Sequence, residues 1–175
     1  MASDDAGRFR PRRLLEVLGE YEVDYILIGG VAGAIHGAPF TTVDLDAVPA
    51  VQRANLDRLA AALDDLEAVL RDADTPEGIR VEWSGHLLKK ALTEFRFLRF
   101  DTRFGYLDLL YRPAGTKGFA DLARDAVDYD LDAVRVRVAA LDDVIRMKQA
   151  AGRPRDLEHL PTLRRLLEIQ RTEGR

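Results

Sequence analysis

The chain has 175 residues, of which 47% are hydrophobic and 32% are charged, a balance typical of a folded domain rather than a disordered chain. It contains no cysteine, which excludes disulfides, thiolate zinc sites and cysteine nucleophiles. The net charge of -4 argues against a general polyanion-binding coat and leaves room only for a local basic patch.

We expect one domain over residues 1–175 that stays in the cytoplasm. No apolar run approaches the roughly 20 residues of a membrane helix, and the acidic start over residues 1–5 has no secretory signal. Only four of the 26 basic residues are lysines, which we interpret as the mark of a GC-rich bacterial genome.

Hydrophobic periodicity predicts strands interspersed with helices, after a basic and mobile segment over residues 1–12. In the first half, the predicted elements are a helix over 14–18, a strand over 23–28, a short helix over 31–36, a strand over 42–48 and an amphipathic helix over 55–70. In the second half they are strands over 79–83, 95–100, 105–111 and 134–138, a short helix over 119–126, and helices over 141–151 and 154–170. The segment 87–92 is ambiguous.

These elements predict an α/β (α+β) fold with a mixed central sheet, helices packed on it, and a C-terminal helical segment over residues 141–171. Helices at the start and end of the chain are expected to cover one face of the sheet.

A glycine pair after a buried strand is the first feature that could carry chemistry. Gly29 and Gly30 lie before a short helix, where glycine lets backbone N–H groups approach a ligand and the helix N-terminus favours an anion such as phosphate. The alternative is a turn that only needs a positive φ.

Three aspartates form the second feature. Strand periodicity places Asp44 and Asp46 on one face, where two carboxylates repel unless solvent or a cation such as Mg²⁺ offsets their charge. Asp108 lies in an otherwise apolar strand, where a carboxylate is costly without a partner. If the two strands are neighbours, the three carboxylates can hold two divalent ions and orient a phosphoryl attack. The alternative is a solvated strand face.

Basic residues near the C-terminus could complete such a site. Lys148 is either a surface lysine or, since lysines are scarce in this chain, a phosphate contact. Arg153, Arg155 and Asp156 are expected to form an ion pair at a helix start. The histidines do not cluster, which argues against a histidine metal site; they are His36, His86 and His159.

In this order, the motifs resemble the nucleotidyltransferase fold of the DNA polymerase beta superfamily, and most closely the small bacterial nucleotidyltransferases of the abortive-infection toxin type. The resemblance covers about residues 23–167 and rests on Gly29-Gly30, His36-Gly37, Pro39, Thr42, Asp44, Asp46, Asp108 and the segment from Leu141 to Asp156.

The resemblance implies a magnesium-dependent enzyme that moves a nucleotide from a nucleoside triphosphate such as ATP to a hydroxyl. Asp44 and Asp46 would bind metals that hold the triphosphate, and Asp108 would bind the second metal and help deprotonate the hydroxyl. Gly29 and Gly30 would let the backbone approach the phosphates. The implied acceptor is a tRNA end, a protein or a small molecule, and a toxin role implies an antitoxin protein; neither a membrane nor a specific DNA partner is expected.

Two positions depart from the family pattern. Gly30, followed by Val31, stands where the family often has a hydroxyl residue, and Phe40 stands where related sequences often have arginine. These departures motivate a second hypothesis, a catalytically degenerate member that binds nucleotide or a partner protein without turnover. A third is a two-metal phosphohydrolase or nuclease, which shares the carboxylate chemistry; the glycine turn favours transfer because it suits a triphosphate.

Overall fold

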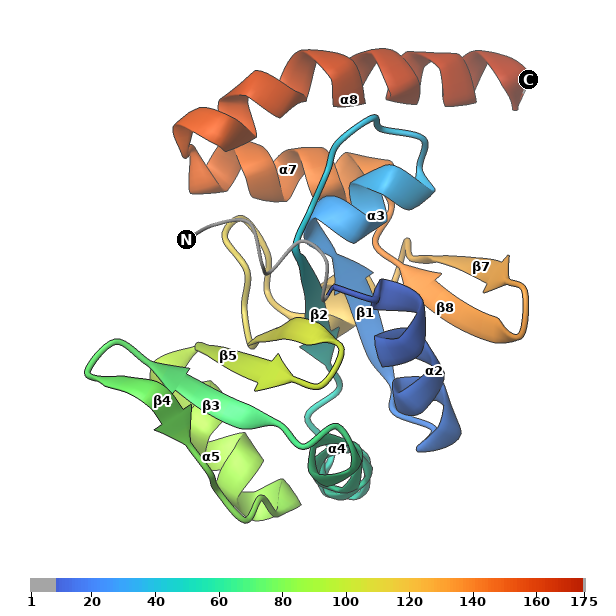
Figure 1. Cartoon of the computed structure of the whole chain (residues 1–175). Coiled ribbons are helices and arrows are strands. Elements are labelled where there is room, and N and C mark those ends of the chain that lie inside the picture. The colour runs from blue at the N-terminus through green and yellow to red at the C-terminus, as the bar shows by residue number, and fades with distance from the viewer. Residues whose placement is uncertain (1–8, 175) are drawn as a thin grey trace.

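The computed structural model describes residues 9–174, in which one mixed sheet carries helices on it (Figure 1). The eight strands lie in the order β4-β3-β5-β6-β2-β1-β8-β7. Their bounds are β1 (Tyr25–Ile28), β2 (Asp44–Pro49), β3 (Val69–Asp72), β4 (Thr75–Ile79), β5 (Phe97–Thr102), β6 (Gly105–Leu110), β7 (Val127–Leu131) and β8 (Val134–Val138). The helices are α2 (Pro11–Glu20), α3 (Gly29–Ile35), α4 (Arg53–Asp65), α5 (Gly85–Phe95), α6 (Phe119–Leu122), α7 (Leu141–Ala151) and α8 (Pro154–Glu173). The predicted fold class is confirmed.

The central strand β2 has one antiparallel and one parallel neighbour. It pairs antiparallel with β1 and parallel with β6, so that Asp46 lies opposite Ile28 on one side and Asp108 on the other. The hairpin of β5 and β6 then places Arg99 opposite Asp108. Since directly opposed residues share a face, these side chains all stand on the same side of the sheet.

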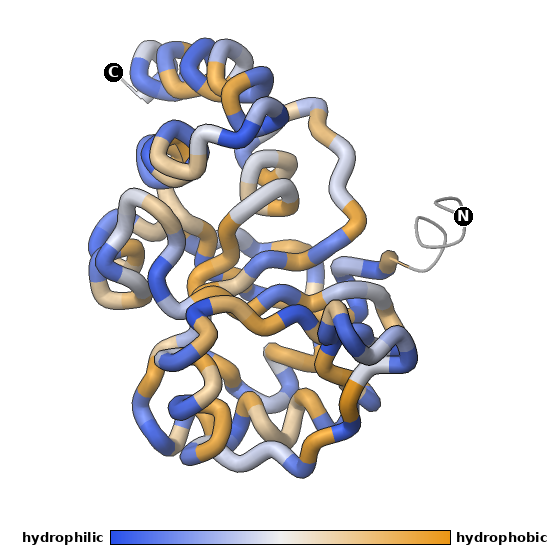
Figure 2. Tube along the Cα trace, turned by 90° about the vertical axis from the view of Figure 1, so that its left-hand side faces the viewer, coloured by the Kyte–Doolittle hydropathy of each residue, from blue (hydrophilic) through white to orange (hydrophobic). Residues whose placement is uncertain are grey.

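The other face of the sheet forms the core. Leu45, Leu107 and Phe100 are fully buried there, and the ring of Trp83 meets that of Phe100 edge-on at 5.6 Å. Helix α5 contacts β5, and α4 packs between α5 and α2. Hydrophobic and hydrophilic stretches alternate along the helices in Figure 2, as expected for helices with one buried and one exposed side.

Helices lie on both faces of the sheet, contrary to the expectation that the helices at the chain ends cover one face. Helix α2 contacts β2 and β8, and α5 contacts β5. Helix α7 instead lines a cavity together with Asp46, on the aspartate face.

The predicted helix over 55–70 is too long. Helix α4 ends at Asp65, Glu67 has the positive φ of 53°, and Leu70 pairs with Phe100 as part of strand β3. The leucine spacing of the helix continues by chance into a strand, so periodicity alone did not mark the boundary.

Other predicted boundaries in the second half also need correction. The strand expected over 79–83 lies over Thr75–Ile79 instead, and the ambiguous segment 87–92 belongs to α5, where Ser84 caps the helix by accepting a hydrogen bond from the Leu87 N–H at 3.2 Å. The helix over 119–126 is only one turn, and strand β7, which follows it, was missed.

Residues 9–12 of the segment predicted to be mobile lie against the fold. The Arg10 N–H donates to the Phe104 carbonyl at 2.9 Å, and α2 already begins at Pro11. The rest of the predicted mobile segment, residues 1–8, lies outside the described residues. Between residues 9 and 174, no helix combines the length and hydropathy that a membrane span needs.

A buried asparagine ties the start of α4 to the end of β2. Asn55 accepts from the Asp24 N–H at 2.7 Å and donates to the carbonyls of Asp24 and Ala50 at 2.9 and 2.8 Å. Asn55→Ala should lower the free energy of unfolding by about 2–3 kcal/mol, because these buried groups lose their partners. Urea unfolding tests this, with Gln52→Ala as control, because Gln52 is exposed and its side chain makes no cap hydrogen bond to α4; an equal loss in both variants would contradict it.

Candidate active site

The three predicted aspartates meet on one face of the sheet. Asp44 and Asp46 stand two residues apart on β2, and Asp108 stands on β6 directly opposite Asp46. The Asp108 side chain is only 3% exposed and that of Asp44 is 24% exposed. The Thr42 hydroxyl donates to Asp44 Oδ1 at 2.9 Å, which fixes that carboxylate.

An arginine that the sequence analysis missed bridges two of these acids. Arg99 donates from Nε to Asp108 Oδ1 at 2.8 Å and from Nη2 to Asp108 Oδ2 at 2.7 Å, a two-pronged contact. The same Nη2 donates to Asp44 Oδ2 at 2.9 Å. Burial raises the pKa of Asp108, and the guanidinium opposes this shift. The signal available in the sequence was the hairpin register, which puts Arg99 opposite Asp108.

Asp46 is the acid without such compensation. Burial raises the pKa of Asp46 to about 7, and the charges of Asp44 and Asp108 add to the shift, while Arg99 and Arg153 oppose it. Among the described residues, no group donates a hydrogen bond to this carboxylate. The site therefore holds one half-buried acid without a hydrogen-bonding partner in the described part of the chain, whose charged form would gain from a cation.

The glycine pair is needed for close approach as well as for backbone conformation. Gly29 has a φ of +68°, and a Cβ there would lie 2.0 Å from Asp46 Oδ2. A Cβ on Gly30 would lie 2.7 Å from the Thr42 Cβ. The backbone of the turn between β1 and α3 thus packs so closely against Asp46 and Thr42 that a side chain at either glycine would clash with them.

Gly29→Ala should therefore disturb the site rather than the fold alone. We expect it to displace Asp46 and to lower any activity of the site at least about tenfold. Gly37→Ala is the matched control, because Gly37 also has a positive φ but its Cβ would meet only Leu166 at 3.9 Å. That control should lose about 1 kcal/mol of stability and keep its activity. Equal loss of activity in both variants would contradict this role of Gly29.

A cavity of about 370 Å³ opens beside Asp46. Its apolar part is formed by Ile28, Leu110, Pro113, Ala114, Val144, Met147 and Ala151, and its polar part by Gly29, Asp46, Lys148, Arg153 and Asp156. The apolar part of the cavity lies next to the cationic side chains of Lys148 and Arg153 and the carboxylate of Asp46. This arrangement suits a ligand that combines an organic ring with an anionic tail.

The predicted phosphate contact Lys148 lies in this polar part, where Asp156 holds it. Its Nζ is 3.1 Å from Asp156 Oδ1, and Arg153 Nε is 2.6 Å from Asp156 Oδ2. Burial would raise the pKa of Asp156, but the hydrogen bonds from Arg153 and Lys148 lower it overall. The expected ion pair at the helix start is confirmed for Arg153; Arg155 instead donates to the Thr41 carbonyl at 2.9 Å.

The departure at Phe40 has a structural counterpart. The Phe40 ring stacks on His159 with centroids 3.8 Å apart, and His159 Nδ1 is 3.4 Å from Lys148 Nζ. His36 is buried elsewhere, with Nε2 2.8 Å from the Ala139 oxygen.

The donor chemistry at the aspartates fits a hard divalent cation such as Mg²⁺, because it consists of carboxylate oxygens, one of them unpaired. In the geometry of residues 9–174, however, no three acidic or histidine side chains are grouped as a metal site. Arg99 holds two of the three carboxylates, so Asp46 is the group most open to a cation.

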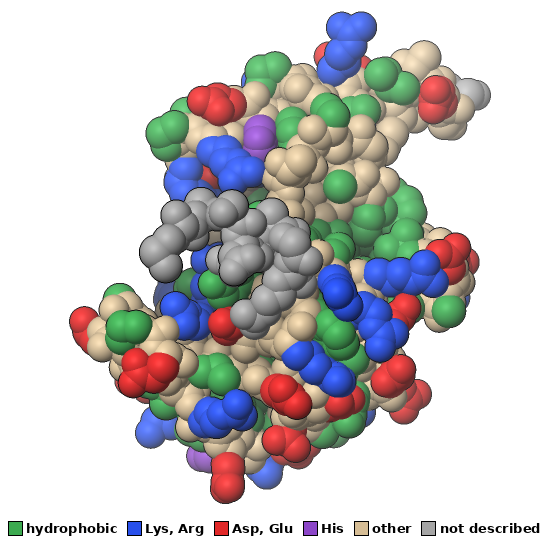
Figure 3. All heavy atoms as spheres, viewed as in Figure 1, with side chains coloured by type: hydrophobic (Ala, Val, Ile, Leu, Met, Phe, Trp, Pro, Cys, Tyr) green, Lys and Arg blue, Asp and Glu red, His purple; other side chains and the backbone are tan. Residues whose placement is uncertain are grey.

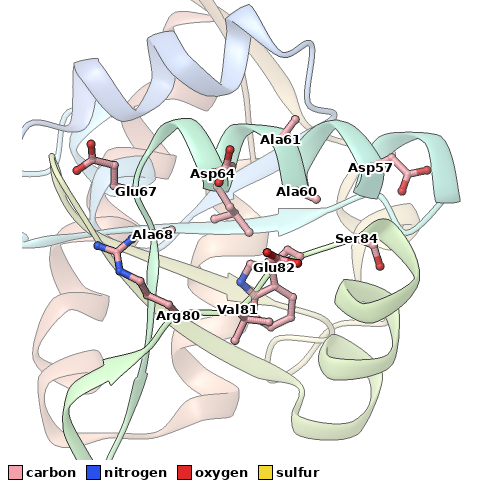
Figure 4. A pocket seen from close by; sticks show the side chains of 12 residues that line it. Asp57, Ala60, Ala61, Asp64, Glu67, Ala68, Arg80, Val81, Glu82 and Ser84 are labelled. Carbon is pink, nitrogen blue, oxygen red and sulfur yellow. The ribbon is translucent and has the colours of Figure 1, made fainter.

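A second, larger groove of about 1130 Å³ lies between α4 and the extended segment 80–84 (Figure 4). Its lining includes Asp64, Glu82 and Trp83 but none of the predicted site residues.

On the face drawn in Figure 3, lysine and arginine side chains gather around the middle, and acidic side chains lie mostly toward the edge.

Comparison with known proteins gives one solved structure to report. The chain is similar to a protein from Thermotoga maritima described as a "putative nucleotidyltransferase", with 15% sequence identity and a TM-score of 0.48, over 92% of this chain and 96% of that one. No model of a protein family matches the sequence. No curated protein matches it either.

Proposed function

We propose that the chain is a magnesium-dependent nucleotidyltransferase that moves a nucleotide from a nucleoside triphosphate to a hydroxyl acceptor and releases pyrophosphate. The observation that carries the proposal is the meeting of Asp44, Asp46 and Asp108 beside a cavity that also holds Lys148 and Arg153. The motif resemblance points the same way. Its toxin-type character favours a tRNA or protein acceptor, and an antitoxin as partner.

Each group in the site has a role in this reaction. Asp46 would hold Mg²⁺, and Asp44 and Asp108 would join it once Arg99 gives up its ion pairs with them; the metal would neutralise charge that develops on the transferred phosphate. Lys148 and Arg153 would bind the triphosphate from the opposite wall, and the positive φ of Gly29 lets the backbone come close to it. Asp108 would help deprotonate the acceptor hydroxyl, as the resemblance implies. The new bond joins the acceptor oxygen to the α-phosphorus, and the bond to pyrophosphate breaks.

Arg99 favours one alternative, a member of the same fold that binds nucleotide without turnover. Its guanidinium already neutralises Asp44 and Asp108, which a catalytic metal would otherwise do. The two functions differ in product, because only the enzyme releases pyrophosphate.

Transfer of label from α-³²P-labelled ATP, CTP, GTP and UTP tests the proposal. The wild type and Asp108→Asn are compared with Mg²⁺ and with tRNA, total protein or the chain itself as acceptor. We expect labelled acceptor and equimolar pyrophosphate from the wild type alone. Nucleotide binding without any labelled product would favour the binding protein, and a cleaved strand would favour a nuclease.

A further inference from the structure

The loop that leaves the Asp108 strand forms one wall of the cavity. Pro113 and Ala114 line it across from Val144 of α7. The loop rests directly on that helix, since a Cβ on Gly115, whose φ is +75°, would lie 2.8 Å from the Ala150 Cβ. The width of the cavity therefore depends on how the loop sits on α7.

Behind this wall, two buried carboxylates share one arginine. Arg146 of α7 donates from Nη1 to Asp121 Oδ2 at 3.1 Å and from Nη2 to Asp143 Oδ1 at 2.7 Å. Asp121 and Asp143 are only 8% and 7% exposed. Asp121 Oδ2 also accepts from the backbone N–H of Lys117 at 3.0 Å. Arg146 therefore holds the end of the loop indirectly, because it binds the carboxylate to which the loop backbone donates.

Arg146 lies on a different side of α7 from the residues that face the cavity. Those cavity residues are Val144, Met147, Lys148 and Ala151. Arg146 is half-buried, and its guanidinium reaches Asp121 of α6, which follows the loop, and Asp143 of α7 itself. It does not touch the space where a ligand would lie.

We propose that Arg146 is a positioning residue of the nucleotide cavity, which holds the wall of residues 113–118 against α7 and so sets the affinity for the nucleotide. The inference rests on the proposed function, because it assigns the cavity to that substrate. No atom of Arg146 takes part in the chemistry, so its loss should weaken binding and leave the reacting groups in place.

Arg146→Gln tests this, with Arg124→Gln as the matched control. Arg124 binds the same Asp121 from the solvent side, is 70% exposed and has no contact with α7 through that bond. We expect the KM for the nucleoside triphosphate to rise about tenfold in Arg146→Gln while kcat changes less than about twofold. The control should keep both values. A fall of about tenfold in the kcat of Arg146→Gln without a change in KM would overturn the proposal. Equal effects of Arg146→Gln and Arg124→Gln on KM would overturn it as well.

Gly115→Ala is a second variant that leaves the buried charges intact. It forces the loop away from Ala150 and should raise the KM in the same way, which keeps the proposal testable if Arg146→Gln does not fold. An unchanged KM in a folded Gly115→Ala protein would overturn the proposal.

A readout independent of activity separates this proposal from the proposed function. Since the chain has no cysteine, Lys117→Cys gives a single site for a nitroxide spin label on the exposed side of the loop. Arg146→Gln should increase the mobility of the label, and Arg124→Gln should not. If the wild type transfers no nucleotide, the proposed function fails, and the role of Arg146 is then judged from the spin label alone. An unchanged spectrum in Arg146→Gln would show that the arginine does not hold the loop of residues 113–118 against α7.

Discussion

Replacing Asp46 by asparagine should abolish transfer and stabilise the protein at the same time. Transfer should fall roughly a thousandfold, about 4 kcal/mol at the barrier, because Asp46 is the one of the three carboxylates that forms no ion pair with Arg99 and is open to a cation. An enzyme in which the loss of a group costs activity but gains stability uses that group for function rather than for folding.

The stability gain should depend on pH in a defined direction. The pKa of Asp46 is raised in the folded state from 3.8 to about 7, so the folded protein keeps a proton that the unfolded chain releases. The contribution of Asp46 to stability is complete below pH 4 and is lost as pH rises through 7. Asp46→Asn should therefore gain as much as about 4 kcal/mol over the wild type at pH 8 and little at pH 4.

Urea unfolding of both proteins without metal, at pH 4 and pH 8, measures this difference. Asp130→Asn, an exposed carboxylate on β7, serves as the control and should shift neither stability nor activity. Destabilisation of Asp46→Asn at pH 8 would mean that Asp46 is a structural group.

Arg99→Met should destabilise the protein strongly, and magnesium should restore part of the loss. Without the guanidinium, Asp108 keeps a buried charge with no partner, which costs about 3 kcal/mol at pH 8. Burial then raises the pKa of Asp108 unopposed, so the loss shrinks as pH falls toward 4 and the carboxylate takes up a proton.

The magnesium arm distinguishes a metal site from an ordinary ion pair. Millimolar MgCl₂ should raise the melting temperature of Arg99→Met more than that of the wild type, because a cation that binds only the folded state stabilises it. Arg103→Met, on the same hairpin but paired with Asp65 at the surface, should lose less than about 1 kcal/mol and show no magnesium effect. A melting temperature of Arg99→Met that ignores magnesium would argue against a metal at these carboxylates.

The sequence predicted the elements best where pattern and turn residues agreed. The strand before Gly29 and the helix that ends at Gly152 are both present, since burial and a glycine stop coincide there. The prediction was wrong where a single signal decided. Leu66 and Leu70 extended the period of a helix, yet the chain turns at Glu67 because pairing of Leu70 with β5 outweighs local propensity.

At the site, the aspartates could be predicted because Asp44 and Asp46 share one face of an alternating strand and Asp108 interrupts an apolar strand. Their neighbourhood depended on strand order, which the sequence gives only through a resemblance. Arg99 was missed although the predicted hairpin held the signal, since one arginine among many on a strand is ordinary unless the register against Asp108 is worked out. The roles of Gly29, Gly30 and Lys148 in binding stay predictions, although their positions around Asp46 suit them.

The cavity has a consequence for the order in which the protein is made. All three aspartates lie within the first 108 residues, whereas the wall with Lys148 and Arg153 comes from the last third of the chain. A ribosome therefore synthesises the acidic strands first. Arg99 lies on β5, between β2 and β6 in the sequence, and can offset the repulsion between Asp44 and Asp108 before the basic helices are made. A nascent chain would thus carry Asp44 and Asp108 paired with Arg99, and Asp46 outside these pairs, until synthesis delivers the helices that bring Lys148 and Arg153 to the cavity.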